Sequence, residues 1–259
     1  MIHRIATIAL HTFKQSVRDK ALYSLIAFAF LLTGASLLFG RISVGIQRLI
    51  LINLGLSGIA VFGLLIAIFI GISLVWREIE RRTLYHVLSK PVARWEFIVG
   101  KYLGLLLTLT VNTAVMAAGF YVALGWLDGR LQARDAGTLE AVYFILLELA
   151  LVVAVALFFS CISSPALSAV FTFCVFVIGN LAGDIRWFGQ ESGSAVMAKV
   201  TTLLYYLLPN FAGFNVISRV AHGELVPGYL LLSNSLYALL YAVILISASI
   251  LIFEERELT

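Results

Sequence analysis

Charged residues are scarce in this chain of 259 residues. Asp, Glu, Lys and Arg together make up 12% of it, whereas hydrophobic residues make up 61%. Because about a quarter of the residues in a soluble domain are charged, this composition excludes an ordinary soluble globular protein. It predicts instead an all-α polytopic membrane protein. Membrane spans and short loops would use nearly the whole length, so residues 1–259 are expected to form a single transmembrane domain.

The motifs of several enzyme classes are also missing. No Gly-x-x-x-x-Gly-Lys-Ser/Thr loop is present, so any ATPase that works with this chain has to be another polypeptide. No Gly-x-Ser-x-Gly segment is present for a serine hydrolase. The histidines are scattered without a zinc-binding spacing: His3, His11, His86 and His222. We therefore expect no enzymatic activity, no metal and no cofactor in this chain.

Cysteine usage and net charge exclude two further classes. Cys161 and Cys174 lie in or beside apolar stretches and lack Cys-x-x-Cys spacing, which favours free thiols over a disulfide or a metal site. The net charge of +4 comes without a basic patch interleaved with aromatic residues outside the loops. We therefore expect no nucleic-acid partner.

Six apolar stretches are long enough to cross a bilayer, which takes about 20 residues as a helix. We expect spans at residues 21–39, 49–75, 97–124, 140–160, 165–182 and 229–253. The first stretch is longer than the core of a usual signal peptide and lacks a small-x-small cleavage site, so a span is favoured over a cleaved signal. Residues 1–20 place apolar side chains at helical spacing among Lys and Arg, which predicts an amphipathic helix along the membrane surface.

The most strongly charged segment, residues 76–101, separates the second and third spans. Short loops rich in Lys and Arg stay on the cytoplasmic side, so we expect this loop and both termini in the cytoplasm of an integral plasma membrane protein, in bacteria the inner membrane. Its cations are Arg77, Arg81, Arg82, Lys90, Arg94 and Lys101. Leu84, Val87 and Leu88 share one side of a short helix that Pro91 ends. This pattern fits a helix that meets a partner protein, and also an amphipathic loop on lipid headgroups.

The same segment resembles the loop after the second span of ABC-2 type permeases, the membrane subunits of ATP-driven exporters. The family pattern is roughly Glu-x-Glu-x-Gly-Thr-Leu, then Leu-Ser-x-Pro-Val-Ser-Arg-x-Glu, then Gly-Lys. The chain has matching residues in the same order and spacing: Glu78, Glu80, Thr83, Leu84, Leu88, Ser89, Pro91, Val92, Arg94, Glu96, Gly100 and Lys101. Arg82 and Ala93 depart from the pattern, where the family often has glycine and serine.

The resemblance implies a six-span permease that pairs with a second copy of itself or a related permease. It also implies an ABC ATPase subunit that binds ATP and Mg. The loop would form a coupling helix in a cleft of that ATPase, so that ATP-driven closure tilts the spans. The residues implied in ATPase coupling are Leu84 and Leu88 as packing anchors, Glu78, Glu80, Arg81 and Arg94 as charge partners, and the remaining motif positions Thr83, Pro91, Glu96 and Lys101.

One ionisable residue, Glu148, lies inside the span expected at residues 140–160. A carboxyl group within a span is costly, which makes it a candidate for the translocation path. The alternative is a structural carboxyl that reaches interfacial water or bonds to a neighbouring helix. Glu148 is also compatible with a proton-coupled secondary transporter, although no inverted repeat or pair of broken helices is apparent. A further alternative is a membrane anchor of a complex that transports nothing. No motif identifies the substrate.

The interval at residues 183–228, between the last two spans, is unlike the other external loops. Within it, residues 195–208 are apolar at helical spacing but measure only about 21 Å as a helix, against a hydrocarbon core of about 30 Å. We expect an external helical hairpin at the outer membrane face, ended by Pro209. Its copies in a dimer would cap the exit path with Tyr205 and Tyr206. The alternative, which the sequence supports equally, is a surface helix that only anchors the fifth span to the sixth.

Overall fold

The structure is a computed structural model that describes residues 2–42, 46–80, 93–129 and 135–255. Every regular element within these ranges is a helix, which confirms the predicted all-α class. The helices are α1 (Ile2–Val17), α2 (Lys20–Ile42), α3 (Gln47–Glu80), α5 (Arg94–Asp128), α6 (Ala136–Ile162), α7 (Pro165–Asn180), α8 (Ala182–Glu191), α9 (Ala195–Leu207), the 3-10 helix η2 (Ala212–Phe214), α10 (Ile217–Ala221) and α11 (Gly228–Glu255).

Four helices of the described chain are long and apolar enough to cross a membrane. They are Gln47–Ile72 of α3, Arg94–Leu127 of α5, Ala136–Ile162 of α6 and Gly228–Glu254 of α11. The count rises to as many as six if each of two bent pairs is one span. These pairs are α7 with α8, bent by 61°, and α9 with the segment Ala212–Ala221 that contains η2 and α10, bent by 54°. The first predicted span falls on α2, whose apolar part is Leu22–Ala35. The chain is therefore a polytopic membrane protein.

The fifth predicted span, residues 165–182, falls on α7, which begins at Pro165 and ends at Asn180. α7 has 16 residues, or about 24 Å of helix, which is less than the hydrocarbon thickness of about 30 Å. The chain bends at Leu181 and continues as α8. α7 on its own is therefore a short span.

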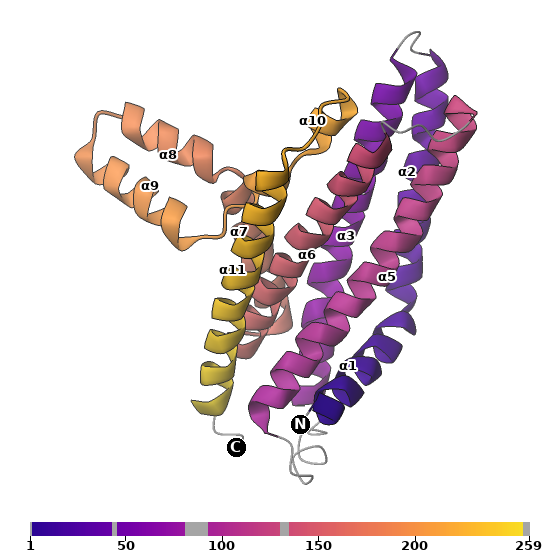
Figure 1. Ribbon diagram of the computed structural model, residues 1–259. Helices are drawn as coiled ribbons and strands as arrows, with labels where there is room; N and C mark the ends of the chain where they lie inside the picture. The colour runs from indigo at the N-terminus through magenta and orange to yellow at the C-terminus, as the bar shows by residue number, and fades with distance from the viewer. Residues whose placement is uncertain (1, 43–45, 81–92, 130–134, 256–259) are drawn as a thin grey trace.

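The long helices alternate in direction, and both termini lie at the same end of the bundle (Figure 1). We call this end the termini end. α2, α5 and α7 run away from it, and α3, α6 and α11 run back toward it (Figure 1). Between α7 and α11, the α8–α9 hairpin leaves the bundle sideways, as Figure 1 shows in orange. A helical hairpin was expected at this place in the sequence.

α6 forms the centre of the bundle. It packs against α3, α5, α7 and α11, and every residue from Leu151 to Leu157 is buried. A helix that is apolar all round belongs in an interior, which explains its position. By contrast, α11 keeps a broad apolar surface exposed: Leu232, Leu236, Leu239, Leu240, Val243 and Ile244. Such a surface is suited to lipid or to another membrane subunit.

The amphipathic helix predicted at the N-terminus is present as α1, and it packs along the first part of α5 (Figure 1). Gly104 on α5 permits the close approach. A Cβ atom there would lie 2.6 Å from both the carbonyl oxygen of Ala9 and the Cβ of Thr12. Thr12 and Ser16 are fully buried. One face of α1 is therefore used for contact with α5, while basic side chains such as Lys14 and Arg18 remain exposed.

Candidate functional site

A pocket of about 390 Å³ opens between α3, α6, α7 and the segment that carries η2 and α10. Three of its α3 residues, Ser57, Ala60 and Val61, lie in the half of α3 that is away from the termini end, and Leu64 lies at the middle of that helix. Its wall is mainly apolar, chiefly Leu64, Ile145, Leu149, Phe176, Phe214 and Ile217. Its polar members are Ser57, Glu148, Asn180 and Asn215. The site therefore combines an apolar surface with a few polar groups, as small-molecule pockets usually do.

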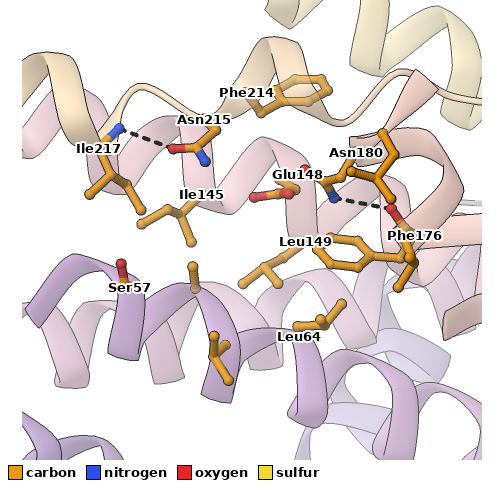
Figure 2. A pocket seen from close by; sticks show the side chains of 14 residues that line it. Ser57, Leu64, Ile145, Glu148, Leu149, Phe176, Asn180, Phe214, Asn215 and Ile217 are labelled. Atoms are coloured by element: carbon orange, nitrogen blue, oxygen red, sulfur yellow. Dashed lines mark hydrogen bonds between the residues drawn. The ribbon is translucent and has the colours of Figure 1, made fainter. Parts of the chain in front are cut away.

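Glu148 is the only charged side chain among the described residues that line this pocket. It is 9% exposed, and Figure 2 shows its carboxylate directed into the pocket. The side-chain amide of Asn180 lines the pocket with it (Figure 2). That amide donates to the carbonyl oxygen of Phe176 at 3.0 Å. The predicted candidate for a translocation path is therefore placed at a cavity, on the buried central helix.

The other two polar residues come from opposite sides of the pocket. Ser57 lies on α3, and Asn215 lies just before α10. The Asn215 side-chain oxygen accepts a hydrogen bond from the amide of Ile217 at 3.3 Å, which leaves its amide nitrogen available (Figure 2). The site as a whole thus presents one carboxylate and neutral hydrogen-bonding groups.

The segment that follows the α8–α9 hairpin, residues 209–215, leads back to the bundle and packs against the end of α7 beside the pocket. Gly179 of α7 lies directly against the carbonyl oxygen of Pro209 and the ring of Phe211, where a Cβ atom would not fit. The Phe211 amide donates to the Gly179 carbonyl oxygen at 3.2 Å. This contact brings Phe214 and Asn215 over the end of α7. Pro209 is therefore placed where the chain turns back to the bundle, as expected, while its part in a gate stays a prediction.

The sequence had not led us to predict Asn180, Asn215 or Ser57 as site residues. A usable signal existed for Asn180, because it is a polar amide within the span predicted at residues 165–182. Asn215 and Ser57 gave no such signal. They become part of the site only through the packing of α10 against α3 and α6.

Tyr205 and Tyr206 lie on α9 of the hairpin, and neither lines the Glu148 pocket. The guanidinium of Arg186 on α8 lies over both rings, 4.8 Å from the centroid of Tyr205 and 5.5 Å from that of Tyr206. Such cation–π contacts hold the two helices of the hairpin together. The tyrosines therefore have a partner within the hairpin, and their role at an exit gate stays a prediction.

Much of the predicted coupling segment lies outside the described residues. This applies to Arg81, Thr83, Leu84, Leu88 and Pro91. Glu78 and Glu80 belong to the last turn of α3, which continues to the edge of this segment. Their proposed contacts with an ATPase stay predictions.

Arg94 begins α5 and contacts the end of α11. Its Nη1 atom donates to the carbonyl oxygens of Phe253 at 3.0 Å and Glu254 at 2.8 Å. These carbonyls belong to the last turn of α11, where a helix leaves its acceptors unsatisfied and favours positive charge. Arg94 therefore joins the helix that follows the coupling segment to the C-terminal helix.

Glu96 and Lys101, the other two motif residues on α5, are buried in the bundle. A Glu96 side-chain oxygen accepts a hydrogen bond from the Ala93 amide at 3.2 Å and lies 4.0 Å from the guanidinium of Arg4 on α1. The Lys101 ammonium lies 5.6 Å from the centroid of the Phe97 ring. Both side chains stabilise the start of α5, and a direct contact with a partner stays a prediction.

The long apolar helices of the described residues define a membrane component. Residues 6–258 match the family described as ABC-2 family transporter protein. The chain therefore belongs to the ABC-2 family of membrane transporter proteins, and the match covers nearly its whole length. A search of curated proteins finds no match.

Proposed function

We propose that the chain is the permease subunit of an exporter, which couples ATP hydrolysis by a separate ABC ATPase to movement of a substrate across the plasma membrane. Family membership supports this proposal, and so does the absence of a P-loop from the full sequence. ATP and Mg would then bind to the ATPase. The cations of residues 76–101 favour a cytoplasmic position for that loop and for the end of the bundle that carries both termini.

The observation that carries the proposal is the junction at the start of α5. Residues 81–92 lead directly into this helix, which Arg94 joins to α11 and Glu96 joins to α1. α5 also packs against α2, α3 and α6. A displacement of the loop by an ATPase would therefore move several helices together, which is how rigid-body transitions are transmitted.

A second permease subunit, either another copy or a related chain, would complete the transporter. The exposed apolar surface of α11 supports this part of the proposal, and so does the α8–α9 hairpin, where Trp187, Phe188, Leu203 and Tyr206 are exposed. Some of this surface would contact lipid and some the partner subunit. Crosslinking of single cysteines on α11 and on the hairpin in native membranes would separate the two surfaces.

The coupling role is tested with Leu84→Asp and Leu88→Asp. Each variant would place a charge where an apolar anchor enters the ATPase cleft, which costs several kcal/mol when the charge is buried without a partner. We expect both variants to insert normally but to lose bound ATPase and stimulated ATP hydrolysis. His86→Asp, which places the same charge beside the apolar stripe, is the matched control and should retain both. Wild-type ATPase binding and turnover in both leucine variants would contradict the proposal.

The alternative function, a proton-coupled secondary transporter, is favoured by the position of Glu148 in the pocket. Its test is proton movement in proteoliposomes that contain this chain without an ATPase and carry a pH-sensitive dye. A secondary transporter would show proton movement that depends on substrate and is abolished by Glu148→Gln. Under the exporter proposal, transport requires ATP and its partner subunit, and the chain alone dissipates no pH gradient.

A further inference from the structure

The described lining of the pocket around Glu148 carries a negative charge and no positive one. The pocket contains a carboxylate that is 9% exposed, and the described residues that line it include no Lys, Arg or His. The polar groups nearest to the carboxylate, the amides of Asn180 and Asn215, are neutral (Figure 2). An ionised carboxylate in an apolar interior is costly unless a cation or several hydrogen bonds accompany it. A positively charged guest would supply the cation that the described lining of this pocket does not provide.

The rest of the wall is suited to the apolar part of the same guest. Phe176 and Phe214 line the pocket together with Leu64 and Leu149. Aromatic rings attract cations in addition to providing apolar contact, so they serve both parts of such a ligand. The volume of about 390 Å³ falls within the range of pockets that hold small organic molecules.

The pocket is also accessible from the apolar surface of the bundle. Val61, Val177 and Leu181 line it and are at the same time exposed. An apolar rim admits molecules that are already dissolved in the bilayer and discourages strongly hydrated ions. A compound that enters here therefore needs a hydrophobic body as well as a charge.

We propose that this pocket binds a lipophilic cation, with its positive charge beside Glu148 and its apolar body against Phe176, Phe214 and Leu149. Asn180 and Asn215, which line the same pocket, hydrogen-bond to any polar group that the cation carries. Within the exporter proposed above, on which this assignment of substrate class rests, the pocket is a binding site for cationic amphiphilic cargo in the half of the membrane away from the termini.

The test measures equilibrium binding to the purified chain in nanodiscs of zwitterionic lipid, with empty nanodiscs as background. The probes are tetraphenylphosphonium and tetraphenylborate, which have nearly the same shape and opposite charge. Wild-type protein should bind the phosphonium saturably and the borate not at all. Glu148→Gln, which keeps the shape of the side chain and removes its charge, should weaken phosphonium binding at least tenfold. Glu148→Asp should retain more binding than Glu148→Gln.

Two further variants locate the effect. Glu140→Gln removes a carboxylate from the same helix, eight residues away, where it lines a different groove, and should bind the phosphonium as the wild type does. Ser57→Phe narrows the pocket without changing its charge and should weaken binding. Equal binding of the two probes, or unchanged phosphonium binding in Glu148→Gln or in Ser57→Phe, would overturn the proposal. Because the measurement needs no ATP and no ATPase, its failure would leave the coupling experiment with Leu84 and Leu88 unaffected.

Discussion

Arg94 and Phe253 are separated by 159 residues in sequence, yet the guanidinium of Arg94 donates a 3.0 Å hydrogen bond to the main-chain carbonyl of Phe253. The same nitrogen reaches the carbonyl of Glu254 at 2.8 Å. The helix that emerges from the charged loop is thereby fastened to the last turn of the C-terminal helix. This contact gives a simple physical route by which force on the loop would reach α11.

Removal of this contact should weaken the termini end of the bundle. We expect Arg94→Ala to lower the free energy of unfolding by about 1–2 kcal/mol, because hydrogen bonds to a charged group contribute about 1.5–3 kcal/mol and the partial solvation of this site reduces that value. The free energy of unfolding of Arg94→Lys should lie between those of the wild type and Arg94→Ala, because a single ammonium group does not reproduce the planar guanidinium. Thermal unfolding of the purified chain in detergent measures the effect. Lys14→Ala, which removes an exposed cation of α1, is the control, and equal stability of Arg94→Ala and wild type would contradict the prediction.

The contact between α1 and α5 should be sensitive to a single methyl group. In Gly104→Ala, the new Cβ would lie 2.6 Å from the carbonyl oxygen of Ala9, so α1 has to move away from α5. Overpacking of this kind typically costs about 1–3 kcal/mol. Gly34→Ala in α2 is the matched control, because no atom lies within 4 Å of its added Cβ. Proteolysis of the N-terminal helix should accelerate in Gly104→Ala alone; equal rates in the two variants would show that the close approach is not required.

An ion pair joins α3 to the start of α6 at the opposite end of the bundle. Arg48 of α3 contacts Asp135, whose side chain is 5% exposed. Arg48→Met would leave a buried carboxylate without this cation, which costs about 3 kcal/mol where the remaining charge stays buried. Asp135→Asn should cost less, because the half-buried arginine can turn toward water. Denaturant titration of the single variants and the double variant gives the coupling energy, and a value near zero would contradict a structural ion pair.

The hairpin should change its exposure during the transport cycle if it caps an exit path. Single cysteines at residues 203–210, in a chain whose Cys161 and Cys174 have been replaced, are labelled with a membrane-impermeant thiol reagent with and without ATP. We expect labelling that depends on nucleotide near Tyr205 and Tyr206. Unchanged labelling at every position would favour the anchor hypothesis. Labelling only from the cytoplasmic side would contradict the predicted topology.

How much of the fold the sequence predicts depends on the range of the interactions concerned. α3, α5, α6 and α11 were predictable because span length and apolarity are local properties of the chain. The end of α7 at Asn180 agrees with the predicted boundary at residue 182, whereas the packing of Phe211 against Gly179 was not predictable, because it joins parts of the chain that are far apart in sequence. α1 was recognised from its periodicity, although the pattern did not reveal that its inner face packs against α5.

The candidate site divides in the same way. Glu148 was recognisable because a carboxyl group inside an apolar stretch is rare. Its surroundings were not, because Ser57, Asn180 and Asn215 come from three separate elements. Arg94, Glu96 and Lys101 were predicted to belong to a surface loop, because their spacing resembles the loop pattern of the family. In the structure their partners lie within the bundle, on α11, on α1 and on α5 itself.

The central position of α6 has a consequence for biogenesis. α3 and α5, which contact α6, are synthesised before it, whereas α7 and α11 follow it. A nascent chain that has reached only α6 would therefore keep one side of this helix in contact with lipid or with insertion factors. α6 gains its full protein surroundings only once α11 is inserted, so ribosome-bound intermediates that lack α11 should be the species most exposed to membrane quality control.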